Sequence, residues 1–135
     1  MTIVDASVAT AWFVEIGTSR SARPLLSRDP LLAPALLRVE VANALLKYVR
    51  AGLSSAALPL DAVRALDSIV HEWVEDAALL PAAISLAVEN RHKIYDCLYL
   101  ALALERREPL VTADRRLAAM ARDLSINVEL IEPTF

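Results

Sequence analysis

Short apolar runs recur along the chain, and longer stretches with helical spacing separate them. Runs of this length, bounded by polar or turn residues, are typical of buried strands. We predict strands at Thr2–Val4, Leu31–Ala33, Ala77–Leu80, Leu110–Thr112 and Val128–Ile131. We predict helices at Ser7–Val14, Ala35–Arg50, Leu60–Trp73, Ala82–Arg91, Tyr95–Arg107 and Arg115–Leu124. Because alternating strands and helices need crossover connections, the pattern predicts an α/β fold with a mainly parallel sheet covered by helices on both faces.

The length and composition indicate one domain with a large apolar core. The 135 residues suit a single domain, which we place at 1–135. Apolar residues make up 56% of the chain, above the roughly 45–50% of an average soluble protein. Since a small chain has much surface for its volume, we expect another subunit to cover part of this apolar surplus, and a homodimer is the default. The segment 58–73 is a candidate dimer surface.

No segment has the pattern of a membrane anchor or an export signal. A transmembrane helix needs about 18 consecutive apolar residues, and the cleanest run, Cys97–Leu104, lies between Asp96 and Glu105. Asp5 stands where a signal peptide would become apolar. The single Cys97 cannot form an intrachain disulfide, so we expect a cytoplasmic protein with no membrane partner.

The charge balance permits a nucleic-acid substrate without implying one. The formal net charge is −3, whereas domains that hold nucleic acid by overall charge are usually basic. Short basic clusters at 91–93, 106–107 and 115–116 are able to contact phosphates, although such clusters are more often solvated faces. The aromatic residues are expected to fill the core, and both histidines are expected at the surface.

Two aspartates follow predicted strands at the same edge of the sheet. Asp5 comes directly after the first strand, and Asp114 comes two residues after Thr112. In an open parallel sheet, ligands gather beyond the carboxyl ends of the strands, so we expect both side chains on one rim. Each also has a simpler interpretation as the N-cap of the helix that follows it.

Two further acids stand on predicted helices. Asp96 begins an otherwise apolar helix, where a charge needs a partner or a cap. Glu40 shares a helical stripe with Asn43 and Lys47, and a solvated stripe is the simpler interpretation. If all four acids meet on the rim, their repulsion requires a divalent cation such as Mg²⁺ or Mn²⁺, which prefers oxygen ligands. Such a site suits phosphodiester hydrolysis.

The ordered motifs resemble the PIN-domain ribonucleases and, within them, the VapC toxins of bacterial toxin–antitoxin pairs. The resemblance covers essentially the whole chain. It rests on four segments, Ile3-Val4-Asp5-Ala6-Ser7, Ala33-Pro34 with Glu40-Val41-Ala42-Asn43-Ala44-Leu45, Ile94-Tyr95-Asp96-Cys97-Leu98-Tyr99, and Val111-Thr112-Ala113-Asp114. It implies a three-layer α/β/α sandwich with about five strands, Mg²⁺- or Mn²⁺-dependent cleavage of RNA, a homodimer and a cognate antitoxin protein.

The resemblance also implies roles for individual residues. It makes Asp5, Glu40, Asp96 and Asp114 an acidic quartet that carries catalysis. Asp5 and Asp96 are then the direct metal ligands, and Glu40 and Asp114 act through water or at a weaker metal position. Ser7, Asn43 and Thr112 are supporting residues. Some relatives carry another acid shortly after the last aspartate, whereas Arg115 and Arg116 follow Asp114 here, which puts a second metal position in doubt.

Two other function classes remain as alternatives. A non-catalytic interaction module with the same fold would have no reason to gather four acids. A Mg²⁺-dependent phosphatase or receiver domain would use Asp5 as a phosphate acceptor, but the phosphatase would carry a second aspartate where this chain has Ser7. A zinc site is not expected, because His71, His92 and Cys97 lack the usual ligand spacing.

Overall fold

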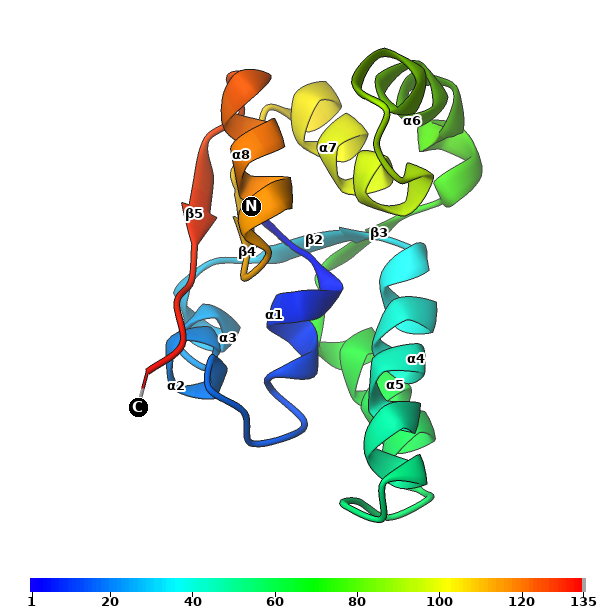
Figure 1. Cartoon of the computed structure of the whole chain (residues 1–135), viewed down its shortest axis with the longest axis vertical. Coiled ribbons are helices and arrows are strands. Elements are labelled where there is room, and N and C mark those ends of the chain that lie inside the picture. Colours follow the sequence, from blue (N-terminus) through cyan, green and yellow to red (C-terminus); the bar gives the residue numbers. More distant parts are fainter. Residues whose placement is uncertain (135) are drawn as a thin grey trace.

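A five-stranded parallel sheet runs through the centre of the computed structural model, which describes residues 1–134 (Figure 1). Its strands are β1 (Thr2–Val4), β2 (Leu31–Pro34), β3 (Glu72–Val74), β4 (Leu110–Thr112) and β5 (Val128–Leu130). Their order in the sheet is β3-β2-β1-β4-β5, and every pairing is parallel. β1 is the central strand, since Ile3 is in register with Leu32 on one side and Leu110 on the other.

Helices cover both faces of the sheet. They are α1 (Ala6–Thr10), α2 (Ser19–Ala22), α3 (Leu25–Arg28), α4 (Leu36–Arg50), α5 (Leu58–Ile69), α6 (Asp76–Asn90), α7 (Ile94–Arg106) and α8 (Arg115–Asp123). Parallel strands are joined by right-handed crossovers, so helices α1–α5, which lead outward to β2 and β3, lie on one face. Helices α6–α8 lead the other way and lie on the opposite face (Figure 1). The predicted three-layer α/β/α sandwich is confirmed.

The strand order creates a switch point beside the central strand. From β1 the chain first builds the sheet outward through β2 and β3, and it then returns to the other side of β1 to place β4 and β5. The connections that leave β1 and β4 therefore depart toward opposite faces. A crevice forms where such connections separate, and the residues that follow these two strands are Asp5 and Asp114.

The core lies on both sides of the sheet, and α7 is its most buried helix. The run Cys97–Ala103 is buried without interruption, because α7 packs on β2 and β4 with one face and on α6 with another. A helix that is apolar all round is stable in this position. Within residues 1–134, no helix is both long and apolar enough to span a membrane.

The predicted strand at Ala77–Leu80 is wrong, since these residues belong to α6. The third strand is instead Glu72–Val74, at the edge of the sheet, where the segment 60–73 was predicted to be helical. An apolar run of four residues has no periodicity that separates a strand from a turn of buried helix. The predicted helix 60–73 ends at Ile69, and Val70 has the extended backbone that leads into β3.

The helix predicted at 7–14 is also shorter than expected, because α1 ends at Thr10. The chain then turns, and the indole N–H of Trp12 donates a hydrogen bond of 2.8 Å to the carbonyl oxygen of Ala22. That bond ties the turn to α2, which the pattern did not predict. α3 was likewise not predicted, and α6 begins six residues before its predicted start at Ala82. The remaining strands and helices lie within one residue of their predicted bounds.

Candidate active site

Asp5 is a buried carboxylate at the centre of the switch point. It follows β1 and is the N-cap of α1, where its Oδ1 accepts a 3.2 Å hydrogen bond from the backbone N–H of Val8. The Ser7 hydroxyl donates to the same oxygen at 2.6 Å. The Thr112 hydroxyl donates to Oδ2 at 2.5 Å. The cap interpretation and the site interpretation are therefore compatible, because a carboxylate oxygen accepts more than one hydrogen bond.

Ser7 and Thr112 join the end of β1 to the end of β4. Besides donating to Asp5, the Ser7 Oγ accepts the backbone N–H of Ala113 at 2.9 Å. The Thr112 Oγ1 accepts the backbone N–H of Asp114 at 3.0 Å. Since each hydroxyl both donates and accepts, the two fix the loop that carries Asp114 relative to Asp5. The structure thus brings together two of the three predicted supporting residues.

Asp114 lies on the same rim and caps α8. Its Oδ1 accepts hydrogen bonds from the backbone N–H groups of Arg116 at 2.9 Å and Leu117 at 3.2 Å. These bonds satisfy two of the donors that a helix leaves unpaired in its first turn. The predicted shared rim of Asp5 and Asp114 is confirmed.

Glu40 is held from within the core by a tyrosine. It lies in the second turn of α4, and the Tyr99 hydroxyl of α7 donates to its Oε1 at 2.7 Å. Tyr99 is only 1% exposed. This hydrogen bond therefore lies inside the protein and joins α7 to α4, which belong to opposite helix layers. Asn43, one turn along α4, is exposed and lines the same cleft as Glu40.

Asp96 lies in the first turn of α7 beside a histidine. The Nε2 of His92 is 2.7 Å from Oδ2 of Asp96. The prediction that both histidines are surface residues is wrong for His92, whose side chain is 5% exposed. His71 is exposed, as predicted. Neither the helical periodicity nor a ligand motif marks His92, because it precedes the helix and meets Asp96 only through the turn between α6 and α7.

The acids of this rim influence one another electrostatically. The pKa of Asp5 is raised to about 6, chiefly by burial and to a smaller extent by the charge of Asp96, against the hydrogen bonds that lower it. Burial also raises the pKa of Glu40, opposed by the Tyr99 hydrogen bond and reinforced by the charges of Asp96 and Asp5. The pKa of Tyr99 lies well above its usual value because of burial and the charge of Glu40. A cation placed among these groups would relieve their repulsion.

A polar cleft of about 530 Å³ lies against this rim, between α1, α4 and the loops that lead into α7 and α8. Ser7 and Ala113 line it on one side, and Glu40 lines it on the other. Two cationic side chains, Lys47 and Lys93, also line it. The cleft therefore combines one carboxylate of the acidic quartet with two ammonium groups, a combination that suits an anionic substrate bound next to a cation.

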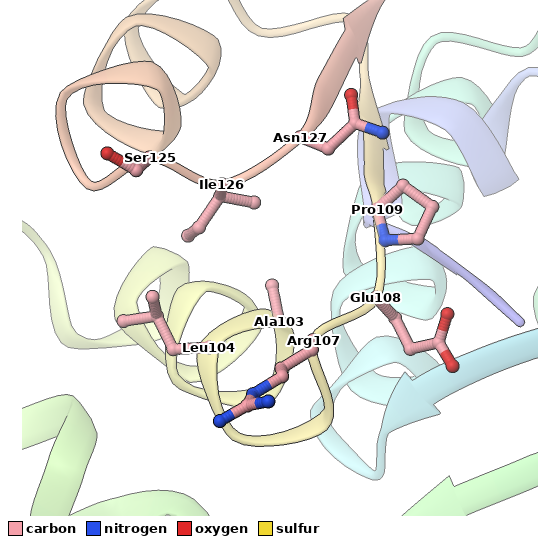
Figure 2. Close-up of a pocket in the computed structure, with 8 residues that line it drawn as sticks. All are labelled: Ala103, Leu104, Arg107, Glu108, Pro109, Ser125, Ile126 and Asn127. Atoms are coloured by element: carbon pink, nitrogen blue, oxygen red, sulfur yellow. The ribbon is translucent and has the colours of Figure 1, made fainter.

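A second pocket, of about 260 Å³, lies at the opposite edge of the sheet (Figure 2). It is bounded by the last turn of α7, by Pro109 before β4, and by the segment 125–127 before β5. Its one carboxylate, Glu108, is paired with the N-terminal amino group at 3.1 Å. Ligands of parallel sheets bind at the carboxyl ends of the strands. This pocket lies at the amino ends of β4 and β5, so it is not the candidate site.

The donor set fits a hard divalent cation bound by few direct ligands. Among residues 1–134, no three carboxylate, histidine or cysteine side chains are arranged to hold a metal ion together. Mg²⁺ is usually bound by one or two carboxylates and keeps several waters, so a three-ligand cage is not required. The raised pKa of the buried Asp5 and the neighbouring charges of Asp96 and Glu40 are the environment that such an ion neutralises.

Sequence reasoning missed two side chains that hold the quartet in place. Tyr99 follows Asp96 by three residues and was expected only to fill the core, and His92 precedes Asp96 by four. Helical spacing places Tyr99 one turn from Asp96, so a polar role for its hydroxyl was open to prediction. The partner of that hydroxyl lies on a different layer, which no local pattern reveals.

Comparison with known proteins matches the PIN domain family over residues 2–123. The chain is 35% identical over 132 residues to Ribonuclease VapC1 of Mycobacterium tuberculosis, covering 96% of each protein. It is 35% identical over 124 residues to Ribonuclease VapC3 of Pyrobaculum aerophilum, covering 86% of this chain and 91% of that one. Among solved structures, PAE2754 from Pyrobaculum aerophilum superposes with a TM-score of 0.72 at 27% identity, covering 94% of this chain and 81% of that one.

Proposed function

The chain belongs to the PIN-domain family, and we propose that it is a metal-dependent endoribonuclease whose active site is the acidic quartet. The observation that supports this best is the geometry of the switch point. Asp5 and Asp114 follow adjacent parallel strands. Asp96 raises the pKa of both Asp5 and Glu40, which places three of the four acids within electrostatic reach of one another. A non-catalytic module would have no need for this cluster, and an aspartyl-phosphate phosphatase would carry a second aspartate where this chain has Ser7.

Asp5 and Asp96 are the proposed direct ligands, with Mg²⁺ or Mn²⁺ as the ion. Asp5 is fixed by three hydrogen bonds, and Asp96 is fixed by His92. When bound, the cation polarises the scissile phosphate and stabilises negative charge on its oxygens. Glu40 and Asp114 would hold the ion through water. Ser7 and Thr112 orient the Asp5 carboxylate, and Asn43 supports the substrate from the cleft wall.

The protein's own side chains account for the remaining chemistry. A carboxylate that is not a direct ligand, Glu40, accepts the proton of the attacking water, and burial raises the pKa of this group, which makes it a stronger base. The Tyr99 hydroxyl, which comes from the opposite helix layer, donates a hydrogen bond to that carboxylate and fixes its orientation. Lys47 and Lys93 of the cleft neutralise phosphates that flank the cleaved bond.

RNA cleavage with matched variants tests this function. The purified chain is incubated with total RNA in Mn²⁺ or in EDTA, and fragments are resolved on a gel. We expect fragments only with Mn²⁺, and their loss in Asp5→Asn. Asp123→Asn is the control, because Asp123 is an exposed carboxylate at the end of α8. Equal cleavage in EDTA, or by Asp5→Asn, would contradict the proposal.

The physiological role that follows is that of the toxin in a toxin–antitoxin pair, with RNA as substrate and an antitoxin protein as partner. The two curated relatives are ribonucleases that carry the VapC name. Expression of the chain alone is expected to arrest growth, and Asp5→Asn is expected to remove that effect. Growth that is normal despite active nuclease in the cells would separate the enzyme from the toxin role.

We also propose that the protein is a homodimer. The apolar surplus of the sequence supports this, as do large apolar side chains that remain exposed, among them Val39 at 66% and Val88 at 74%. The segment 58–73, proposed as a dimer surface, forms α5 and most of β3. Light scattering after size-exclusion chromatography measures the mass directly, and a value near the 14.7 kDa of one chain would reject the dimer.

A further inference from the structure

The turn between α6 and α7 encloses a histidine beside one carboxylate of the quartet. The His92 side chain is 5% exposed and that of Asp96 is 15% exposed. The His92 Nε2 lies 2.7 Å from Oδ2 of Asp96, a short distance for a hydrogen bond to a carboxylate.

The backbone of the turn is fixed, and it therefore fixes the ring. Arg91 ends α6 in the left-handed conformation with φ of 50°. The backbone N–H groups of Arg91 and His92 both donate to the carbonyl oxygen of Ala87, which closes the end of α6. α6 packs directly on α7. The imidazole is thus attached to a rigid corner and not to a mobile loop.

We propose that His92 is a positioning residue for Asp96. Its ring N–H holds Oδ2 of the carboxylate and leaves Oδ1 without this hydrogen bond, so that Asp96 would present Oδ1 to the divalent cation. This inference rests on the proposed metal-dependent nuclease function and adds to it the group that orients one of its ligands.

Such a residue is needed because the terminal torsion of an aspartate is broad. Its carboxylate plane is not confined to a narrow staggered position, so without a partner the two oxygens of Asp96 would exchange places freely. Asp5 has three hydrogen bonds that define its carboxylate plane. His92 supplies the corresponding restraint for Asp96. Loss of partners that orient metal ligands typically weakens metal binding by about 10- to 100-fold.

Mn²⁺ titration of the purified protein by calorimetry tests the proposal with two variants of the same residue. We expect His92→Leu to raise the Kd for Mn²⁺ by about 10-fold or more, because it fills the space without a donor. We expect His92→Gln to recover most of the affinity, because its amide N–H reaches a position similar to that of Nε2. A role in packing alone would not be restored by the amide.

The matched control is His71→Leu. The Nδ1 of His71 accepts the backbone N–H of Leu31 at 3.0 Å, so this variant also removes one histidine hydrogen bond. It does so at the amino end of β2, at the edge of the sheet opposite to the quartet. We expect its Kd for Mn²⁺ to equal that of the wild type.

A measurement on the metal-free protein covers the case in which His92→Leu does not fold. Nitrogen-15 spectra of the imidazole rings report the hydrogen bond directly, and we expect Asp96→Asn to shift the His92 ring resonances and leave those of His71 in place. Unshifted His92 resonances would overturn the proposal. So would folded His92→Leu with wild-type Mn²⁺ affinity, or His92→Gln as weak as His92→Leu. If the wild type cleaves RNA with Mn²⁺ and any of these results is found, only the role of His92 is overturned. If the wild type does not bind Mn²⁺, the proposed metal-dependent function is overturned as well.

Discussion

At the scale of single residues, the carboxylates of this site are held by hydrogen bonds from the protein and still destabilise one another. Asp5 is the clearest case, since it accepts from Ser7, Val8 and Thr112 and its pKa nevertheless rises to about 6. Burial therefore outweighs the hydrogen bonds. A residue that served only as a helix cap would remain at the surface, where ionisation costs little.

This balance predicts a pH dependence for the metal-free protein. A carboxyl whose pKa is 3.8 when unfolded and about 6 when folded stabilises the fold most when it is protonated, and stability is lost as the pH rises through that range. Between pH 5.0 and 7.5 the wild type should lose about 1 kcal/mol more unfolding free energy than Asp5→Asn, measured by urea denaturation in EDTA. Asp123→Asn serves as the control and should follow the wild type. Parallel curves for wild type and Asp5→Asn would show that Asp5 is ionised without penalty.

The hydrogen bond from Tyr99 to Glu40 gives a second prediction. Tyr99→Phe leaves the ring in the core and removes only the hydroxyl that donates to Glu40. An acceptor that is left unsatisfied in the interior costs about 1–3 kcal/mol, and Glu40 is only partly buried, so the unfolding free energy should fall by about 1 kcal/mol. Tyr95→Phe is the matched control, because Tyr95 is 55% exposed and its change should stay within about 0.5 kcal/mol. Equal effects of the two variants would argue against the buried bond.

At the scale of elements, the sequence predicts best where pattern and position agree. β1 and β4 were predicted to the residue because each is a short, largely apolar run with an aspartate within two residues of its end. β3 was missed because an edge strand of three half-buried residues carries no apolar run. The neighbouring segment 77–80 is apolar for a different reason, since α6 buries Leu79 against α7.

The residues of the candidate site also fall into two groups, those that the local sequence pattern predicts and those that it does not. The shared rim of Asp5 and Asp114 follows from strand ends and parallel topology. Glu40 and Asp96 were placed in the site by family resemblance, because helices from two layers converge only in the folded protein. His92 was assigned to the surface, since a contact made through the turn between two helices depends on how those helices pack. Local pattern thus predicted the rim but not the groups that support it.

The buried position of α7 leads to a prediction at this scale. Leu100 is 0% exposed, whereas Leu104, one turn later on the same helix, is 42% exposed. Leu100→Ala should lower the unfolding free energy by about 2–5 kcal/mol, because the shorter side chain leaves a cavity in the core. Leu104→Ala should cost less than about 1 kcal/mol. Similar losses in urea denaturation would mean that a partner covers the outer face of α7.

At the scale of the whole molecule, the protein carries a net negative charge, and its substrate RNA is a polyanion that such a charge repels. The net charge of −3 means that long-range attraction does not bring RNA to the site. Local cations must serve instead, and the cleft beside the quartet offers Lys47 and Lys93. Lys47 lies seven residues after Glu40 on α4, about 10 Å along the helix axis at 1.5 Å per residue. That position suits a phosphate beyond the cleaved bond.

RNA binding should therefore depend only weakly on salt, and one variant should weaken the dependence further. For single-stranded RNA, the logarithm of the binding constant falls with the logarithm of salt concentration by about 0.7 per neutralised phosphate. Lys47→Ala should reduce that slope by about 0.7 in fluorescence anisotropy titrations in EDTA. Arg122→Ala removes an exposed cation from the last turn of α8 and should leave the slope unchanged. If Arg122→Ala reduced the slope as much as Lys47→Ala, RNA would be held by diffuse surface charge and not by the cleft, and the path assigned to the substrate would be wrong.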